Sequence, residues 1–411
     1  MTYGLIGEHL GHSFSPAIHE RLSGLPYELR ELAPSQLGAF LKNEPFRGIN
    51  VTIPYKQAVI PYLDRLAPSA QLTGAVNAIV RESDGTLTGH NTDMDGFIDM
   101  ARHAGIDFKG ARVVILGAGG AAKAVAAAAG ALGAASVSNA VRTPRAADQL
   151  SLQEPARFAD AEILINATPV GMSPNVDGKL LDLSAFPHLK GVLDCIYNPL
   201  RTNLILDAQE LGIPADGGLR MLAAQAVRAS ELFRNCTIND DAIDDICSFL
   251  LRSRRNIVLC GMPSSGKSTI GKELAARLGM ELIDTDDIVR QEAGVEIPAI
   301  FEKEGEAGFR ARESKAVEAA AARQGVVIAT GGGAVLNQAN VRALKRGGLL
   351  CFIDRPLELL EATADRPLSA DRASLERLYA RRRPVYLWAA DIVVPNCGTV
   401  AEAVDIILES C

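Results

Sequence analysis

The amino-acid sequence predicts an α/β protein, because short apolar strands alternate with helical segments along most of its length. In the first half, strands are predicted at residues 112–116, 161–166 and 191–194. Each is followed by turn residues and a helical periodicity, which is the pattern of a parallel sheet covered by helices. The alternation recurs in the second half, with strands at 257–260, 326–329 and 349–353.

Length and a change in composition predict two separate parts. The chain has 411 residues, whereas an ordinary domain holds roughly 100–200. A helical pattern at 221–233 and an acidic stretch at 239–245 lead to Arg252-Ser-Arg-Arg255, and a new strand begins at Ile257. We therefore expect a boundary near Ser253, between parts 1–252 and 253–411.

Composition and charge exclude several classes of function. The net charge of -7 leaves no broad basic surface for a nucleic acid or an anionic membrane. The longest apolar run, near 124–132, is too short to span a bilayer, and no targeting segment is evident at the start. The seven cysteines lack CxxC spacing, which favours reduced thiols. We expect a soluble cytoplasmic protein that acts on small molecules.

A glycine-rich turn follows the strand at 112–116 and opens an alanine-rich helix. Its residues are Gly117, Ala118, Gly119, Gly120 and Ala121. Backbone amides at such a helix start face a pyrophosphate, whereas the alternative is a turn that only packs a helix closely on a sheet. We favour dinucleotide binding because strand, turn and helix occur in the required order.

The next strand indicates which dinucleotide binds. Where an acidic residue would favour NAD, the chain has Arg142, Thr143 and Arg145. Two guanidinium groups are suited to a 2′-phosphate. The sequence therefore predicts NADP(H).

A second phosphate-binding loop is more specific than the first. The segment Gly261-Met-Pro-Ser-Ser-Gly-Lys-Ser268 is a complete GxxxxGKS loop between a strand and a helix. Its amides would surround nucleotide phosphates, Lys267 would reach the β and γ oxygens, and Ser268 would help to hold Mg²⁺. The predicted nucleotide contacts are Ser264, Ser265, Gly266, Lys267, Ser268 and Thr269.

Several further segments of the first half resemble shikimate dehydrogenase, over residues 1 to about 248. They are His12-Ser-Phe-Ser-Pro-Ala-Ile-His19, Asn50-Val-Thr-Ile-Pro-Tyr-Lys56, Gly74-Ala-Val-Asn77, Asn91-Thr-Asp93, Ile165-Asn-Ala-Thr-Pro-Val-Gly-Met172, Asp194-Cys-Ile-Tyr-Asn-Pro199 and Gly217-Gly-Leu-Arg-Met-Leu-Ala-Ala-Gln225. The resemblance implies a substrate-binding α/β part, about 1–104 with returning helices about 219–248. It also implies a Rossmann-like NADP part, about 105–218.

The resemblance to shikimate dehydrogenase also implies residue roles. Lys56 would give a proton to the ketone oxygen as hydride transfer builds negative charge there, and Asp93 would orient the lysine. Ser13 and Ser15 would hold the substrate carboxylate, although Ser15 could instead serve only as a helix N-cap before Pro16. The other implied substrate contacts are Thr52, Asn77, Tyr197 and Gln225, and Cys195 and Gly218 would lie near the nicotinamide.

The second half resembles shikimate kinase over roughly residues 255–411, in a P-loop fold like that of nucleoside monophosphate kinases. The resemblance is carried by Ile283-Asp-Thr-Asp286, Gly308-Phe-Arg-Ala-Arg-Glu313, Thr330-Gly-Gly-Gly333 and Asp365-Arg-Pro-Leu368. It implies ATP with Mg²⁺, held by Ser268 and Asp284. Asp286 would bind the ring hydroxyls and accept a proton, while Arg310, Gly332 and Arg382 would bind shikimate and Arg366 would stabilise the transferring phosphoryl group.

The expected function is NADPH-dependent reduction of 3-dehydroshikimate to shikimate, followed by ATP-dependent formation of shikimate 3-phosphate. Two alternatives stay open. Val141 stands before Arg142, where the dehydrogenase family commonly has Asn, so the first half could use quinate with NAD. Ala362 and Ser369 depart from the kinase pattern in a short lid, so the second half could bind nucleotide without transferring phosphate. The oligomeric state is left open.

Overall fold

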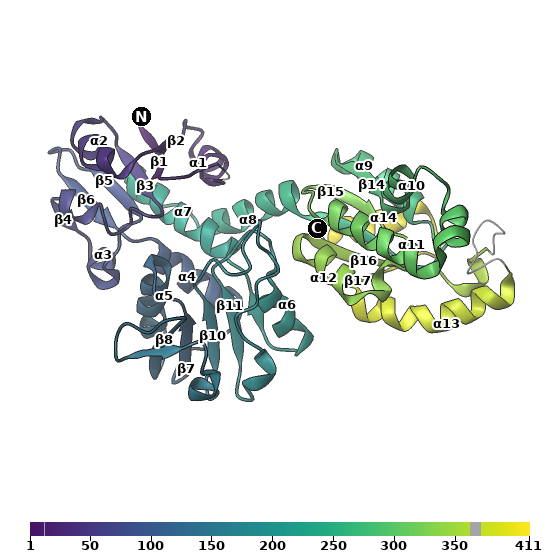
Figure 1. Cartoon of the computed structure of the whole chain (residues 1–411). Helices are drawn as coiled ribbons and strands as arrows, with labels where there is room; N and C mark the ends of the chain where they lie inside the picture. Colours follow the sequence, from purple (N-terminus) through teal and green to yellow (C-terminus); the bar gives the residue numbers. More distant parts are fainter. Residues whose placement is uncertain (12, 362–370) are drawn as a thin grey trace. The chain divides into compact units, whose positions relative to one another are not determined.

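The structure of the protein is a computed structural model that describes residues 1–11, 13–361 and 371–411 (Figure 1). The chain divides into two compact units, Met1–Ser248 and Phe249–Cys411. Helix α8 (Asp241–Arg254) begins in the first unit and ends in the second. Each unit is described by itself below.

The first sheet of the first unit is mixed and has the strand order β2-β1-β3-β5-β6-β4. β5 runs antiparallel to both of its neighbours. Its strands are β1 (Tyr3–Gly7), β2 (Glu28–Glu31), β3 (Gly48–Val51), β4 (Arg65–Leu66), β5 (Ala78–Arg81) and β6 (Leu87–His90), and its helices are α1 (Ser15–Ser23), α2 (Leu37–Asn43) and α3 (Pro68–Thr73). Ile6, Ile49 and Ile79 are fully buried at its centre.

The second sheet of this unit is entirely parallel, in the order β12-β11-β10-β7-β8-β9. Its strands are β7 (Arg112–Leu116), β8 (Ser136–Val141), β9 (Gln149–Ser151), β10 (Ile163–Asn166), β11 (Gly191–Asp194) and β12 (Ala215–Asp216), with helices α5 (Gly120–Ala131) and α6 (Asn203–Glu210). The connection from β8 to β9, residues 142–148, contains no helix, although parallel strands are usually joined by a longer helical crossover. Arg142 and Arg145 therefore lie on an exposed loop.

Two helices connect the parts of the first unit that contain these sheets. They are α4 (Asp93–His103) and α7 (Leu219–Arg234). A methyl group on Gly96 would lie 2.6 Å from the main-chain oxygen of Met221. The two helices can therefore pack this closely only because glycine has no side chain at this position. Figure 1 shows α4 beside the second sheet and α7 extending to the first.

The second unit contains one parallel sheet in the order β14-β15-β13-β16-β17. Its strands are β13 (Asn256–Cys260), β14 (Glu281–Asp284), β15 (Val326–Ala329), β16 (Gly348–Asp354) and β17 (Ile392–Pro395). Its helices are α9 (Lys267–Leu278), α10 (Thr285–Ala293), α11 (Ile297–Ala321), α12 (Gln338–Gly347), α13 (Arg372–Ala389) and α14 (Val400–Glu409). The central strand β13 leads into the phosphate loop. In a parallel sheet, a crevice for ligands forms where the connections after two neighbouring strands run to opposite sides of the sheet, and β13 lies at such a position.

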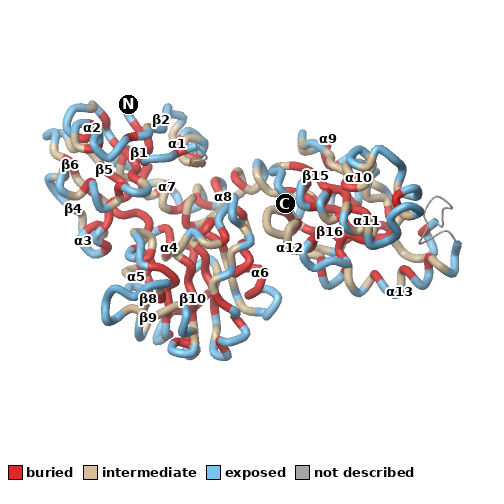
Figure 2. Tube along the Cα trace, in the orientation of Figure 1, coloured by how far each residue is buried: buried red, intermediate tan, exposed pale blue. Residues whose placement is uncertain are grey.

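Short 3-10 helices fill several connections, at Pro34–Gln36, Ile60–Tyr62, Pro155–Phe158, Leu183–Ala185, Ala334–Leu336 and Leu357–Leu359. Central strands such as β10 and β16 are buried along nearly their whole length (Figure 2). The predicted α/β class is confirmed in both units. No helix in the described ranges is long and apolar enough to cross a membrane.

The Gly96 contact predicts opposite effects for two glycine-to-alanine substitutions. Gly96→Ala should destabilise the first unit by about 1–3 kcal/mol, because the added methyl group meets backbone that cannot turn away. Gly130→Ala, near the end of α5 with nothing within 4 Å of the new methyl group, should stabilise it by up to about 1 kcal/mol through helix propensity. Chemical denaturation of the full chain measures both, and a stabilising Gly96→Ala would contradict the packing.

Burial of His19 in α1 predicts a dependence of stability on pH. Burial lowers the pKa of His19 from 6.5 to about 3, against a hydrogen bond with Asn50 that raises it. Between these two values the unfolded chain binds a proton that the folded chain excludes. The contribution of His19 is therefore present above pH 6.5 and is lost as the pH falls, by about 1.4 kcal/mol per pH unit.

The measurement is urea unfolding at several pH values between about 7 and about 5, followed by hydrogen exchange in peptides of β1 and β3. His19→Phe keeps an aromatic ring and removes the titration, so its stability should fall less steeply than that of the wild type. His188→Phe, at an exposed histidine, should leave the slope unchanged. Parallel slopes for His19→Phe and the wild type would show that His19 contributes nothing.

Candidate active sites

The first candidate site is centred on an ion pair between Lys56 and Asp93. Lys56 follows β3 and Asp93 is the first residue of α4. Lys56 Nζ lies 2.6 Å from Asp93 Oδ2, and the two side chains are 19% and 9% exposed. The start of α4 also favours the carboxylate, because unpaired backbone N–H groups and the helix dipole are positive there. A half-buried ammonium held by a carboxylate can give a proton to an adjacent oxygen.

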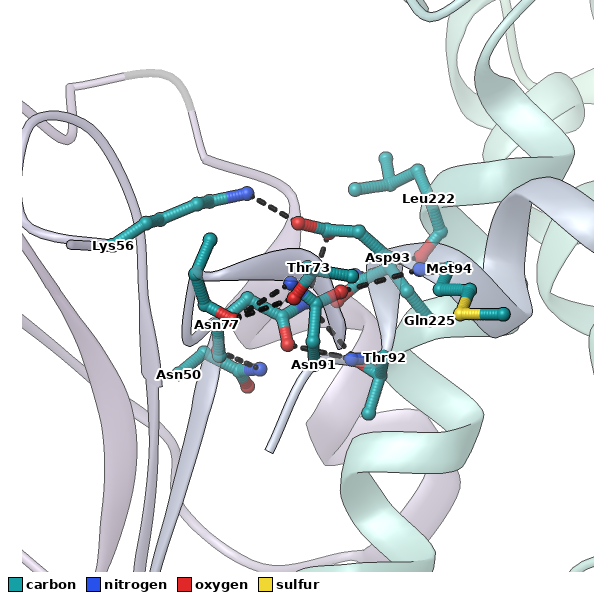
Figure 3. A network of polar contacts seen from close by, with 11 residues as sticks. Asn50, Lys56, Thr73, Asn77, Asn91, Thr92, Asp93, Met94, Leu222 and Gln225 are labelled. Carbon is teal, nitrogen blue, oxygen red and sulfur yellow. Dashed lines mark hydrogen bonds and ion pairs between the residues drawn. The ribbon is translucent and has the colours of Figure 1, made fainter. Parts of the chain in front are cut away.

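A network of polar contacts fixes the orientation of Asp93 (Figure 3). Asn77 Nδ2 donates to Asp93 Oδ1 at 2.8 Å and to Thr92 Oγ1 at 3.0 Å, while Asn77 Oδ1 accepts from the Thr92 N–H at 2.7 Å. Asn91 is fully buried and donates to the carbonyl of Ala75 at 2.9 Å. Asn77, predicted as a substrate contact, is thus also a support for Asp93, and Thr92 is a member of the site that the sequence analysis did not single out.

The two serines lie at the start of α1. Ser15 is the first residue of the helix and Phe14 takes the N-cap position without a side-chain hydrogen bond. The alternative that Ser15 is only an N-cap is therefore wrong. The Ser15 N–H donates instead to Ser13 Oγ at 3.2 Å. Tyr197, from the loop after β11, lies against Phe14 with ring centroids 5.3 Å apart, so the structure brings Tyr197 to the serine segment.

Two other predicted substrate contacts lie on elements that border the same region. Thr52 follows β3, and its N–H donates to the carbonyl of Ile6 at 3.0 Å. Gln225 lies on α7, and its side-chain amide donates to the carbonyl of Leu222 at 2.9 Å (Figure 3). Both are half-buried.

The glycine-rich turn after β7 faces the Lys56–Asp93 pair. A methyl group on Gly120 would lie 3.6 Å from Lys56 Cδ. Gly117 has a φ of 115°, and Asn139 Nδ2 donates to its carbonyl at 2.7 Å. These contacts fix the turn at the carboxyl end of β7. Ala118 and Gly119 lie in this turn, and Ala121 lies in the first turn of α5, which begins directly after it. Helix N–H groups there are suited to a pyrophosphate.

Cys195 and Gly218, the two positions predicted to lie near a nicotinamide, lie close to the Lys56–Asp93 pair. Gly218 N–H donates to the carbonyl of Ile196 at 2.9 Å, and a side chain at Gly218 would collide with the carbonyl of Cys195. Burial raises the pKa of the Cys195 thiol, and the charges of Asp194, Asp93 and Lys56 also act on it. Cys195 is thus a neutral group close to the dyad.

The predicted 2′-phosphate contacts Arg142, Thr143 and Arg145 are all exposed on the β8–β9 connection. The Arg145 N–H donates to Gln149 Oε1 at 2.8 Å. Among the described residues, neither guanidinium group takes part in a salt bridge with an acidic side chain. Both are therefore accessible to a phosphate.

The second candidate site begins at the phosphate loop of the second unit. Gly261, Ser264 and Gly266 all have positive φ, at 149°, 62° and 90°, so the loop turns sharply between β13 and α9. The buried side chain of Asn396 donates to the carbonyl of Ser265 at 2.8 Å and holds the loop. Thr269 lies exposed in the first turn of α9.

Two predicted oxygen ligands of the phosphate loop region converge. Ser268 Oγ donates to Asp284 Oδ2 at 3.1 Å, and Lys267 Nζ donates to the carbonyls of Gly261 and Met262 at 3.1 and 2.8 Å. The described residues contain no group of three or more His, Cys, Asp or Glu side chains that could hold a metal. One hydroxyl and one carboxylate fit Mg²⁺, which keeps several waters and takes its other ligands from phosphates.

A cluster of charged side chains lies beside the loop after β15. A methyl group on Gly331 would lie 2.6 Å from Asp286 Oδ1 and 2.7 Å from Glu313 Oε1. Arg310 donates to Glu313 Oε2 at 2.7 Å. Glu313 is 1% exposed, and burial raises its pKa, while Arg310 opposes that rise. Glu313 was not predicted as a site residue, although it ends the segment that suggested Arg310.

Arg382 completes this cluster from α13. It donates to the carbonyl of Gly332 at 3.0 Å and is 2% exposed. Its Nε and one terminal nitrogen have no hydrogen-bond partner within the described ranges, and burial lowers the pKa of the guanidinium group. A buried guanidinium group with unused donors is costly unless an anion binds there. Arg366 lies outside the described residues.

The comparisons with known proteins match these two sites to two families. Residues 5–79 match the model of the shikimate dehydrogenase substrate binding domain, and residues 263–411 match that of shikimate kinase. The shikimate dehydrogenase (NADP(+)) of Moorella thermoacetica is 39% identical over 255 residues, which cover 56% of this chain and 86% of that protein. The one of Caldanaerobacter subterraneus is 36% identical, over 56% of this chain and 91% of that protein.

Solved structures match the same part of the chain. Shikimate dehydrogenase 1 from Peptoclostridium difficile has a TM-score of 0.56 at 34% identity and covers 61% of this chain and 98% of its own. The Thermus thermophilus enzyme in complex with NADP(H) and shikimate has a TM-score of 0.53 at 31% identity, over 61% and 99%. A quinate dehydrogenase from Corynebacterium glutamicum in complex with NAD has a TM-score of 0.54 at 31% identity, over 61% and 98%. The chain therefore belongs to the shikimate dehydrogenase family in its first unit and carries a shikimate kinase domain in its second, which confirms both resemblances.

Proposed function

We propose that the chain catalyses two consecutive reactions. The first unit reduces 3-dehydroshikimate to shikimate with NADPH, and the second phosphorylates shikimate to shikimate 3-phosphate with ATP and Mg²⁺. The observation that carries the proposal is that each unit assembles its own charged site beside its own phosphate-binding loop. Lys56 and Asp93 lie next to Gly120. Arg382 and Asp286 lie around the loop at Gly331 and Gly332, and a methyl group on Gly332 would lie 3.1 Å from Pro263 of the phosphate loop. We place the division between the two enzymes near Ser253, within helix α8.

In the dehydrogenase unit, protein side chains manage the charge that develops on the substrate. NADPH supplies the hydride. Lys56 stabilises the oxygen on which negative charge builds and gives it a proton, while Asp93 keeps the ammonium in place. Ser13 and Ser15 at the start of α1 hold the carboxylate, and Thr52, Asn77, Tyr197 and Gln225 bind the ring hydroxyl groups.

In the kinase unit, the site residues would position the attacking hydroxyl of shikimate and the terminal phosphate of ATP, and would neutralise the phosphate charge. A Mg²⁺ ion held by Ser268 and Asp284 would neutralise charge on the phosphates. Asp286 accepts the proton of the attacking hydroxyl, and Lys267 stabilises the terminal phosphate. Arg310 and Arg382 hold the substrate carboxylate, with Gly332 allowing close approach of the ring. Arg366 keeps the role that the resemblance gives it.

The choice of NADPH over NADH rests on the exposed arginines of the β8–β9 connection. Arg142 and Arg145 offer two cations where the 2′-phosphate would lie. Relatives named for NADP(+) agree with this choice. The quinate dehydrogenase with NAD has the same fold at similar identity, so fold alone does not decide it. We also propose a cytoplasmic location, because the seven cysteines are scattered and lack CxxC spacing, which favours reduced thiols.

Two lysine substitutions in the full chain test the assignment. Lys56→Ala should lower kcat for the dehydrogenase reaction by about 10²–10⁴-fold and leave phosphorylation intact. Lys267→Ala should lower phosphorylation by about 10²–10³-fold and leave reduction intact. The assay supplies 3-dehydroshikimate, NADPH and Mg-ATP, follows NADPH by absorbance and detects shikimate 3-phosphate by mass. Loss of both activities from either substitution would contradict two separate sites.

The buried guanidinium group predicts a binding effect at the kinase site. Arg382→Lys should raise KM for shikimate by about 10–100-fold, because a lysine cannot reproduce two charge-assisted bonds in one plane. Arg381→Lys, at the exposed neighbouring residue, is the matched control and should change KM by less than about twofold. KM for ATP should stay constant in both variants. Equal effects of the two substitutions would argue against Arg382 as the carboxylate ligand.

A further inference from the structure

Two buried aromatic side chains lie behind the substrate site of the dehydrogenase unit. Tyr27, directly before β2, and His19 of α1 are 5% and 4% exposed. Their rings are parallel, with centroids 4.2 Å apart, and Phe233 of α7 lies 5.9 Å from His19 on a third element. The ring of Tyr27 is therefore stacked on His19, and His19 in turn packs against Phe233 of α7.

The hydroxyl of Tyr27 begins a buried chain of hydrogen bonds. It donates to Asn50 Oδ1 at 2.7 Å, and Asn50 Nδ2 donates to the carbonyl of Asn77 at 3.1 Å. Asn77 Nδ2 in turn donates to Asp93 Oδ1 at 2.8 Å, and Asp93 pairs with Lys56 (Figure 3). Because the Asn77 carbonyl can only accept, the nitrogen of the Asn50 amide must face Asn77, and its oxygen therefore faces the Tyr27 hydroxyl, which donates to it.

Tyr27 also lies beside the segment predicted to hold the substrate carboxylate. Burial raises the pKa of Tyr27 well above its usual value, and a hydrogen bond with Ser15 opposes that rise. With the lowered pKa of His19, both rings are neutral at ordinary pH. They can influence the site through hydrogen-bond geometry and not through charge.

We propose that Tyr27 is a positioning residue of the dehydrogenase reaction. Its hydroxyl, fixed by the stack on His19, sets the side chains of Asn50 and Ser15 and so ties the carboxylate end of the site to the Lys56–Asp93 pair. The inference rests on the proposed dehydrogenase function. It assigns Tyr27 no contact with the substrate.

Removal of the hydroxyl alone tests the proposal. In the full chain, Tyr27→Phe keeps the stacked ring, and kcat/KM for 3-dehydroshikimate should fall about tenfold, mainly through KM. KM for NADPH and the kinase activity of the same molecules should stay at wild-type values. Tyr62→Phe is the matched control, because that ring is 50% exposed and far less constrained; it should leave all constants unchanged.

A second variant guards against a purely structural effect. His19→Leu removes the stack and the hydrogen bond of His19 with Asn50 but keeps the Tyr27 hydroxyl, so it should also raise KM for 3-dehydroshikimate. In a double-mutant cycle, Tyr27→Phe should have a smaller effect when Ser15→Ala is already present, because part of its action passes through Ser15. A structural role alone would lower the unfolding midpoint without moving KM.

Three outcomes overturn the proposal. One is an unchanged KM in folded Tyr27→Phe, another is strict additivity with Ser15→Ala, and the third is an unchanged KM in His19→Leu. Failure of the underlying function is distinguishable, since the wild-type chain would then oxidise no NADPH with 3-dehydroshikimate, which removes both the function and the inference.

Discussion

The close packing of α4 against α7 sets the distance between the two halves of the dehydrogenase site. α4 begins at Asp93, and α7 begins directly after Gly218. Gly96, one turn into α4, lies against the main-chain oxygen of Met221 in the first turn of α7. The starts of the two helices therefore lie side by side. One start holds Asp93, which pairs with Lys56, and the other adjoins Gly218, so the proposed catalytic pair and the proposed nicotinamide position both depend on this contact.

The two sites handle buried charge in different ways. In the dehydrogenase unit, Lys56 and Asp93 already neutralise each other, and Asn77 satisfies the remaining carboxylate oxygen. In the kinase unit, Arg310 is paired with Glu313, but Arg382 keeps donors without partners in the described part of the chain. Under the proposed assignments, a substrate carboxylate would meet neutral hydroxyl groups in one unit and a buried cation with unused donors in the other.

The sequence was sufficient for features that depend on neighbouring residues. The strands at 112–116 and 257–260 were recognisable because an apolar run leads directly into a glycine-rich loop, and the structure has strands at Arg112–Leu116 and Asn256–Cys260. Residue types whose role depends on distant partners were not recognisable. Thr92 and Glu313 have ordinary surroundings in sequence, and only folding places Thr92 against Asn77 and Glu313 against the loop at Gly331.

The start of α1 and the β8–β9 connection show the same limit. A Ser-Pro pair is a good N-cap signal, but the helix begins one residue earlier than the pair suggests, which leaves the Ser15 hydroxyl available to Tyr27 and substrate. Nothing local indicates that β9 follows β8 without a helix. Because the connection has no helix, it is a short exposed loop, and this loop carries Arg142 and Arg145.

Under the assignments proposed above, the two sites would bind the same carboxylate by different chemistry. In the proposed dehydrogenase site, the serine pair at a helix start would bind the substrate through neutral donors and a partial positive charge, so binding there would need little desolvation of full charges. In the proposed kinase site, Arg382 is already desolvated and would gain its missing partners from the shikimate carboxylate. Folding already removes water from Arg382, so the free energy of desolvating this guanidinium group would not have to be supplied again when an anion binds. Under these assignments the kinase site gains more hydrogen bonding to a buried cation from the shikimate carboxylate than the dehydrogenase site does.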